Sequence, residues 1–228
     1  MRSRCWAHEN RIAVDLLNVF KYILFMTSRA TSVPPLSLSH GQALWVLQHM
    51  GFRTGDTPTA FNSYVMGLRR ADLPFAMDEL GRGPGHNITY RYEHLMELTV
   101  ALALRAQAIL PRDIVGLLAQ HRNRLRRIYR LAWTERDSGL GAPVPVGVGT
   151  QKPFQLSGVW LDLRLMYTDT GLLFHIAPTA LGPAQYLERT STKNITQHMR
   201  PPIPVSDLAE QVVQLAPTAP EVRRGRRA

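Results

Sequence analysis

Two helices with clear start and stop signals, separated by a short turn, are the feature that most restricts how this chain can fold. Ser39 and Gln42 have the spacing of a capping box, and Gly51 supplies the glycine that commonly ends a helix. Thr57 followed by Pro58 has the pattern of a second helix start. Two short helices around a tight turn are typical of a helix-turn-helix, so we expect the fold to begin with such a pair.

The second of these helices has one apolar and one polar face. Apolar residues recur at i, i+3, i+4 and i+7, which predicts a buried stripe made of Phe61, Tyr64, Val65 and Leu68. The opposite face is polar and ends in two arginines, whose guanidinium groups suit phosphates or a guanine edge, while asparagine can pair with adenine. An ordinary solvated helix face is the alternative. The expected DNA contacts on this helix are Thr59, Asn62, Ser63, Arg69 and Arg70.

A β-hairpin "wing" is expected after the second helix. Residues 75–80 and 88–92 have strand chemistry and flank a loop rich in glycine. Side chains of this hairpin would contact phosphates or the minor groove of DNA. The alternative is that these residues only form the turn and have no role in binding. For Arg91, a cation–π contact with its neighbouring tyrosines is equally compatible. The candidate DNA contacts of the wing are Arg82, His86, Asn87 and Arg91.

Two further helices follow, over residues 93–108 and from Pro111 to about Arg136. The second carries an alternating 4,3 apolar spacing that is typical of coiled-coil contact, and it predicts a homodimer. Its arginines are expected to form a solvated flank of that coiled coil, with DNA backbone or an acidic partner as alternatives. The predicted dimer seam consists of Ile114, Leu118, Leu125, Ile128, Ala132 and, as a polar register residue, His121.

The order of these elements over about residues 38–136 resembles that of the MerR-type transcriptional regulators. The segments that carry the resemblance are Ser39–Met50, Thr57–Arg70, Thr89–Tyr92 and Leu95–Leu118. In that family the second helix enters the major groove, the wing touches the DNA backbone and the long helix pairs two subunits. The resemblance therefore implies the same roles here. No cysteines follow the long helix, so the metal-sensing branch of the family is not implied.

The remainder of the chain is expected to be less regular. We expect an N-terminal extension and linker over 1–37, a second linker over 137–157, a small C-terminal module over 158–200 and a mobile basic tail over 201–228. In the module, strands near 159–167 and 172–176 should form a hairpin, followed by a short helix at 183–190. Its outward strand face is expected to bind a partner or effector and to be dispensable for DNA contact; the residues of that face are Trp160, Asp162 and Arg164.

The composition narrows the classes of function. The chain has 27 basic and 17 acidic residues, and only three of the basic residues are lysines. This favours a polyanionic partner, although a genome rich in G and C would also raise the arginine share. A single cysteine, Cys5, excludes a disulfide framework and multi-cysteine metal sites. The sequence lacks the motifs of the common catalytic and nucleotide sites, so we expect neither enzyme activity, cofactor nor metal.

The sequence predicts a mainly α fold: a winged helix-turn-helix module with a long seam helix, followed by a small C-terminal α+β hairpin module. The expected function is that of a homodimeric, sequence-specific regulator that binds double-stranded DNA in the cytoplasm, at the nucleoid. The alternatives are a protein–protein adaptor that keeps the winged helix as a scaffold, and an RNA- or ribosome-associated protein. Residues 39–92 hold five basic and four acidic residues, and this nearly balanced charge is compatible with an adaptor. The pI of about 10.4 for the whole chain is compatible with binding to RNA. No membrane partner is expected, because no apolar run approaches the ~20 residues of a span.

Overall fold

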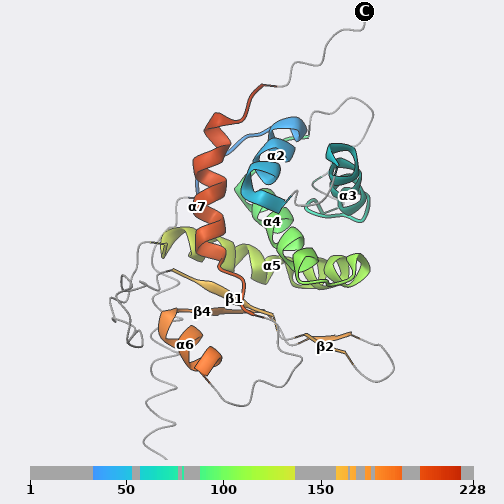
Figure 1. Cartoon of the computed structure of the whole chain (residues 1–228). Coiled ribbons are helices and arrows are strands. Elements are labelled where there is room, and N and C mark those ends of the chain that lie inside the picture. The colour runs from blue at the N-terminus through green and yellow to red at the C-terminus, as the bar shows by residue number, and fades with distance from the viewer. Residues whose placement is uncertain are drawn as a thin grey trace, which may run out of the picture. The chain divides into compact units, whose positions relative to one another are not determined.

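A computed structural model of the chain describes residues 33–52, 57–76, 79, 88–136, 158–163, 165–167, 173–175, 178–191 and 201–221. This part of the chain is mainly helical, as the sequence predicted (Figure 1). None of its helices is long and apolar enough to cross a bilayer. The helices are α2 (His40–Leu47), which continues into the wider turn η1 (Gln48–Phe52), α3 (Pro58–Arg70), α4 (Tyr92–Ala106), α5 (Pro111–Thr134), α6 (Pro183–Ser191) and α7 (Val205–Leu215), which continues into the short 3₁₀ turn η2 (Ala216–Thr218).

The capping signals of α2 and α3 act as predicted. The Gln42 N–H donates to the Ser39 hydroxyl at 3.4 Å, and the Ser39 N–H donates to the Gln42 side chain at 3.0 Å. Gly51 has φ +86°, a left-handed conformation that favours glycine at a helix end. At the start of α3, the hydroxyl of Thr57 accepts from the Ala60 N–H at 3.2 Å. The two helix boundaries predicted from these residues are therefore confirmed.

The strand pairing predicted for the wing is wrong for the described residues. Tyr90 pairs with Leu38 through two antiparallel backbone hydrogen bonds of 2.8 and 3.0 Å, rather than with the segment after α3. Phe75 is buried, and its ring packs edge-on against the ring of Tyr90 with the centroids 5.0 Å apart. The segment that begins at Phe75 thus contributes a core side chain where a strand partner was expected. Residues 77, 78 and 80–87 of the predicted wing lie outside the described part of the chain.

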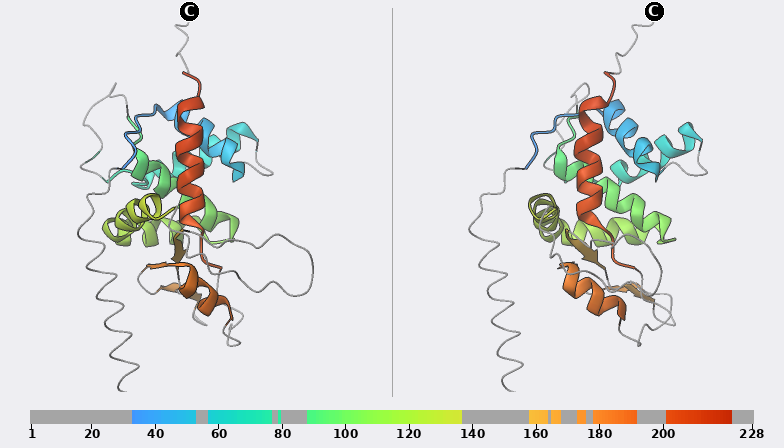
Figure 2. Two further views of the ribbon diagram at one scale, coloured as in Figure 1. Left: turned by 90° about the vertical axis from the view of Figure 1, so that its left-hand side faces the viewer. Right: turned by 60° about the vertical axis from the view of Figure 1, so that its left-hand side comes forward.

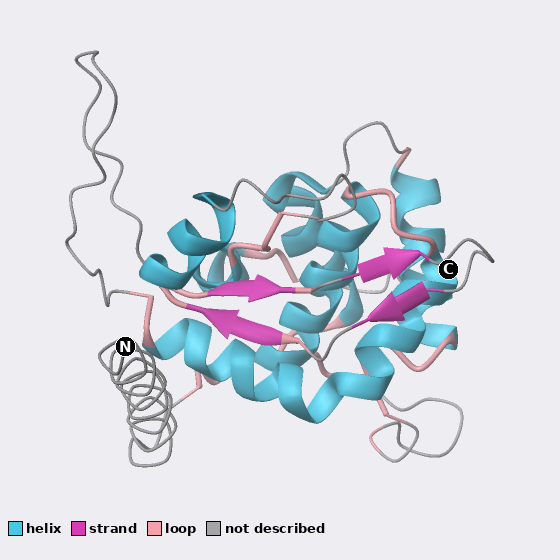
Figure 3. Cartoon of the chain, turned by 90° about the horizontal axis from the view of Figure 1, so that it is seen from below, coloured by secondary structure: helices cyan, strands magenta, loops and turns pink. Residues whose placement is uncertain are grey.

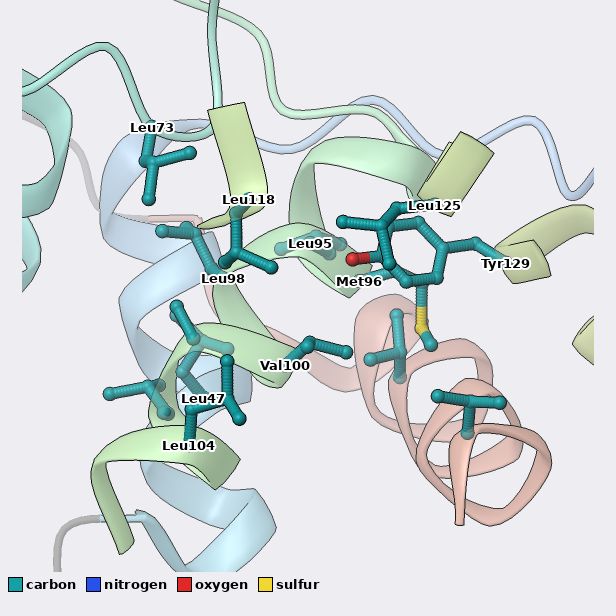
Figure 4. Close-up of a cluster of buried hydrophobic side chains, with 14 of the residues drawn as sticks. Leu47, Leu73, Leu95, Met96, Leu98, Val100, Leu104, Leu118, Leu125 and Tyr129 are labelled. Carbon is teal, nitrogen blue, oxygen red and sulfur yellow. The ribbon is translucent and has the colours of Figure 1, made fainter. Parts of the chain in front are cut away.

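Helix α4 forms the centre of the core. Most of its residues are buried, because α5 packs against one side of it and α7 against another. In Figure 4, side chains of α5 such as Leu118 and Leu125 point toward Leu95, Met96 and Leu98 of α4. This arrangement explains why α4 is buried nearly all round, including its polar residues His94, Glu97 and Thr99.

The apolar seam of α5 is used within the chain, so its assignment as a dimer interface is wrong. The 4,3 spacing correctly indicated contact with another helix, but the partners are α4 and α7 of the same chain. His121, the sixth predicted seam residue, is half-buried. The five buried seam residues are Ile114, Leu118, Leu125, Ile128 and Ala132, each at most 6% exposed.

The segment predicted as a mobile tail contains α7, so this expectation is wrong for residues 201–221. Val205, Ala209 and Val212 are fully buried and belong to the same core as α4 and α5. The two views of Figure 2 show α7, in red, lying across the bundle, where it contacts α2, α4 and α5. Of the predicted tail, residues 222–228, with their four arginines, lie outside the described part of the chain.

Short strands follow the long helix in sequence. Strand β1 (Trp160–Asp162) pairs antiparallel with β4 (Thr179–Leu181), and β2 (Leu165–Tyr167) pairs antiparallel with β3 (Leu173–His175). Figure 3 shows both pairs in magenta. The β2–β3 pairing confirms the expected hairpin, and α6 confirms the short helix predicted after it.

The C-terminal strands are not a separate module with an exposed partner surface. Trp160 is 7% and Asp162 3% exposed, which contradicts their assignment to an outward face. Trp160 stacks on Tyr186 of α6 with the ring centroids 4.7 Å apart, and the next strand residue, Leu161, belongs to the core formed by α4, α5 and α7. Strand β1 is therefore covered on both faces. The sequence-based prediction assumed that alternate residues of the strand face solvent, and this assumption is wrong here. The side chain of Arg164, the third residue of the predicted surface, lies outside the described part.

Candidate nucleic-acid interface

Helix α3 presents a polar face to solvent. Phe61, Val65 and Leu68 anchor its inner face in the core, while Tyr64, expected in the same stripe, is only half-buried. The guanidinium of Arg105 covers the Tyr64 ring at 4.1 Å from the centroid. In Figure 1, α3 lies at the edge of the helical bundle, away from α7. Four of the five predicted contact residues of α3 are exposed: Thr59, Asn62, Ser63 and Arg70.

Arg69, the fifth predicted contact residue of α3, is half-buried and has a partner inside the protein. Burial raises the pKa of Tyr90, and the positive charge of the nearby Arg69 guanidinium, together with a smaller hydrogen-bond contribution, opposes that rise. The same hydroxyl lies 2.9 Å from Nδ1 of His40, at the start of α2. Arg69 thus helps to join α3 to the segment before α4, a role that the sequence did not indicate.

Of the predicted wing residues, the structure places only Arg91. Its side chain is exposed at the start of α4, and its backbone N–H donates to Nδ1 of His94 at 3.2 Å. Arg82, His86 and Asn87 lie outside the described residues. The structure therefore shows an exposed polar face on α3. The contribution of the wing stays a prediction.

Three arginines of α5, spaced four residues apart, form ion pairs with glutamates from other elements. Nε of Arg122 donates to Glu97 of α4 at 2.9 Å, and Nε of Arg130 donates to Glu93 of α4 at 3.1 Å. Between them, Arg126 holds both oxygens of a single glutamate, Glu79, at 2.7 and 2.8 Å. The expectation that these arginines form a solvated flank is therefore wrong for Arg122 and Arg126, whose side chains are 12% and 20% exposed, whereas the side chain of Arg130 is 49% exposed.

The Glu97–Arg122 pair is the most deeply buried of these ion pairs. The side chain of Glu97 is 1% exposed and that of Arg122 is 12% exposed. Burial raises the pKa of Glu97 to about 7, and the charge and hydrogen bond of Arg122 oppose the rise. The second carboxylate oxygen, Oε2, is buried and has no hydrogen-bond partner among the described residues. The ionised carboxylate is therefore only partly compensated.

The neighbouring titratable groups have pKa shifts with different causes. The fork of Arg126 lowers the pKa of Glu79 to about 2, because it stabilises the ionised carboxylate. Burial lowers the pKa of His94, although Glu79 lies 3.7 Å from its Nε2 and favours the charged form. Because the His94 Nδ1 accepts the Arg91 N–H, protonation there would also remove the hydrogen bond at the start of α4.

We expect Glu97→Gln to change how stability depends on pH. Because the folded-state pKa of Glu97 is raised, its contribution to the free energy of unfolding is fully present below the unfolded value near 4.5 and is lost as pH rises through about 7. The shift corresponds to about 3 kcal/mol at most. Glutamine is neutral throughout, so this loss should be absent from the variant.

Denaturant unfolding of wild type and Glu97→Gln at several pH values between 4.5 and 7.5 measures the effect. His94 contributes with the opposite sign, because its lowered pKa gives stability above 6.5 that is lost at lower pH. Its contribution is common to both proteins and cancels in their difference. Parallel stability curves for the two proteins would show that Glu97 does not titrate in this range.

No family model matches this sequence, and no curated protein or solved structure is found to be similar to it. In the part of the chain that the structure describes, no three His, Cys, Asp or Glu side chains are grouped so that they could hold a metal ion. The exposed face of α3 and the helices that hold it are therefore the features of this chain that bear on its function.

Proposed function

We propose that the protein is a sequence-specific double-stranded DNA-binding regulator that reads its site with α3. The observation that carries the proposal is the division of α3 into a core-anchored face and an exposed face with Asn62, Ser63 and Arg70. A helix of this kind fits the major groove of B-form DNA, where base edges carry distinct donor and acceptor patterns. The preceding helix α2 is itself anchored in the core, which supports a helix-turn-helix arrangement.

The exposed residues of α3 suit two different roles. Asn62 and Ser63 lie in the first half of the helix and carry groups that can hydrogen-bond base edges. Arg70 is its last residue and suits a phosphate contact, which supplies affinity that depends on salt. Arg91 and the predicted wing residues Arg82, His86 and Asn87 would add backbone or minor-groove contacts under the same proposal.

The MerR-type organisation is proposed only for the DNA-binding half of the chain. Homodimerisation at paired half-sites remains part of the proposal, because such regulators commonly bind palindromic sites. The contact between subunits must then involve surfaces other than the buried residues of α5.

Asn62→Ala and Arg70→Ala should affect DNA binding in different ways. Loss of a bidentate base contact should reduce the preference for the selected site by ~1–3 kcal/mol in Asn62→Ala. Arg70→Ala should lose a phosphate contact. Its affinity should therefore fall by the same factor for every DNA sequence, and the dependence of its affinity on salt should become less steep by about one unit. Both positions are exposed, so the melting temperatures should hardly change.

The experiment begins with selection of duplexes from a random pool by the wild-type protein. The selected duplex and a scrambled duplex are then titrated with wild type and both variants at two salt concentrations. Arg112→Ala is the matched control, since it removes an exposed arginine from the start of α5. If α3 is the reading helix, this control should behave as wild type. Identical curves for all four proteins would reject α3 as the reading helix, and a wild type without salt-dependent binding would favour the adaptor function.

A further inference from the structure

The C-terminal end of α3 is closed by a tight turn that the sequence did not predict. The Ala71 N–H donates to the carbonyls of Gly67 and Leu68 at 3.2 and 3.0 Å, and the Leu73 N–H donates to Leu68 at 3.0 Å. Between them, Asp72 has φ +59°, in the left-handed region that residues other than glycine rarely adopt. A conformation of this kind persists where surrounding contacts hold it.

Arg122 of α5 supplies such a contact. Its Nη2 donates to the backbone carbonyl of Asp72, directly after α3, while its Nε donates to Glu97 of α4 at 2.9 Å. One guanidinium therefore connects α4, α5 and the end of α3. Because the guanidinium is planar and its N–H groups have fixed directions, the two bonds restrict orientation as well as distance.

A second arginine on the same face of α5 holds the chain further on. Arg126, one helical turn after Arg122, binds both carboxylate oxygens of Glu79, and Glu79 also accepts the N–H of Ala76 at 3.0 Å. The segment that leaves α3 is thus attached to α5 at two points. Its attachment uses charged hydrogen bonds, which are stronger and more directional than apolar contact.

We propose that Arg122 is a positioning residue, which holds the end of α3 so that the exposed face of α3 meets DNA at a fixed angle. This role rests on the proposed DNA-reading function. Arg122 is only 12% exposed, so it would act through the backbone of Asp72 rather than by touching DNA. Its contribution is then to discrimination between sequences, because base contacts depend on the angle of the helix more than phosphate contacts do.

Arg122→Lys is the variant that separates positioning from charge balance. A lysine ammonium can still pair with Glu97, so no buried charge is left alone, but it lacks the second arm that reaches the Asp72 carbonyl. Arg130→Lys is the matched control: it makes the same change two turns later, at a pair with Glu93 that does not involve α3. The double variant Arg122→Met/Glu97→Leu removes both charges together, and it serves if the lysine variant does not fold.

Hydrogen–deuterium exchange of the amides of Ala71, Asp72 and Leu73 measures the local stability of the turn in the absence of DNA. We expect exchange there to rise by about tenfold or more in Arg122→Lys and in the double variant, as loss of a hydrogen bond to a charged group implies. Exchange in the interior of α4 should stay unchanged, and Arg130→Lys should match wild type throughout. In DNA titrations, the affinity ratio of selected to scrambled duplex should fall while the salt slope stays constant.

The outcomes separate this inference from the function on which it rests. Wild-type exchange at the turn in both Arg122 variants, or an unchanged affinity ratio despite faster exchange, would overturn the positioning role. A wild type that binds no duplex would reject the proposed function and with it the reading role, whereas faster exchange would still establish that Arg122 holds the turn. An equal loss of discrimination in Arg130→Lys would also contradict the inference, because that residue does not contact the end of α3.

Discussion

Replacing Val212 with aspartate should abolish cooperative folding of the helical core, including the candidate DNA-binding face. Val212 lies in α7, is fully buried and belongs to the core cluster shared with α4 and α5. The substitution removes apolar burial and places a carboxylate where water cannot reach it. We expect a loss of about 4 kcal/mol or more, which is comparable to the whole stability of many domains.

Circular dichroism and thermal unfolding of Val212→Asp measure this loss, and Gln211→Asp provides the control. Gln211 is the exposed neighbour of Val212 on the same helix. An aspartate introduced there stays in contact with water, so it should alter the melting temperature only slightly. A chain that ends at Arg136 should fail in the same way as Val212→Asp, contrary to the sequence-based expectation that the C-terminal part is dispensable. Cooperative melting of that shortened chain would contradict the role of α7.

Gly158→Ala should be strongly destabilising, by about 3 kcal/mol or more. Gly158 has φ +85°, and a Cβ placed on it would lie 2.5 Å from Cβ and 2.8 Å from Oγ of Ser206. Ser206 cannot easily move away, because its hydroxyl donates to the Ala132 carbonyl and accepts the Val159 N–H, both at 2.8 Å. The substitution would therefore break contacts that join α5, the residue before β1 and α7.

Gly51→Ala is the matched control for this prediction. Gly51 has almost the same φ, +86°, but a Cβ there would meet no atom within 4 Å. Its replacement should cost only the left-handed backbone strain of about 1–2 kcal/mol. Denaturant unfolding of both variants isolates the steric part of the Gly158 effect. Equal losses of stability would show that backbone strain alone matters at both glycines.

Local signals in the sequence were sufficient for the elements whose ends are set by their own residues. The capping residues Ser39 and Thr57 located α2 and α3, and the turn before β3 located the hairpin. The exposed face of α3 followed from helical periodicity. These features depend on residues within a few positions of one another, which is why a single sequence reveals them.

The partners of buried elements could not be predicted in this way. The seam of α5 has the same spacing whether its partner is a second chain or α4 and α7 of the same chain. Helix α7 carries a regular apolar stripe, but the prolines before it favoured the interpretation as a mobile tail. The ion pairs of Arg122 and Arg126 join residues 25 and 47 positions apart, so only the folded structure shows them.

The position of α7 also determines when the protein can finish folding during its synthesis. Domains commonly fold as they emerge, with the N-terminal parts first, while the ribosome adds roughly 5–20 residues per second. Here α5 ends about 80 residues before the end of α7, and α2 and α4 end earlier still, so the apolar faces that α7 covers lack this partner for at least about 4 to 16 s after they are made. During that interval the nascent chain exposes apolar surface that α7 later buries, and the DNA-reading face proposed for α3 is supported by the complete core only once α7 has been translated.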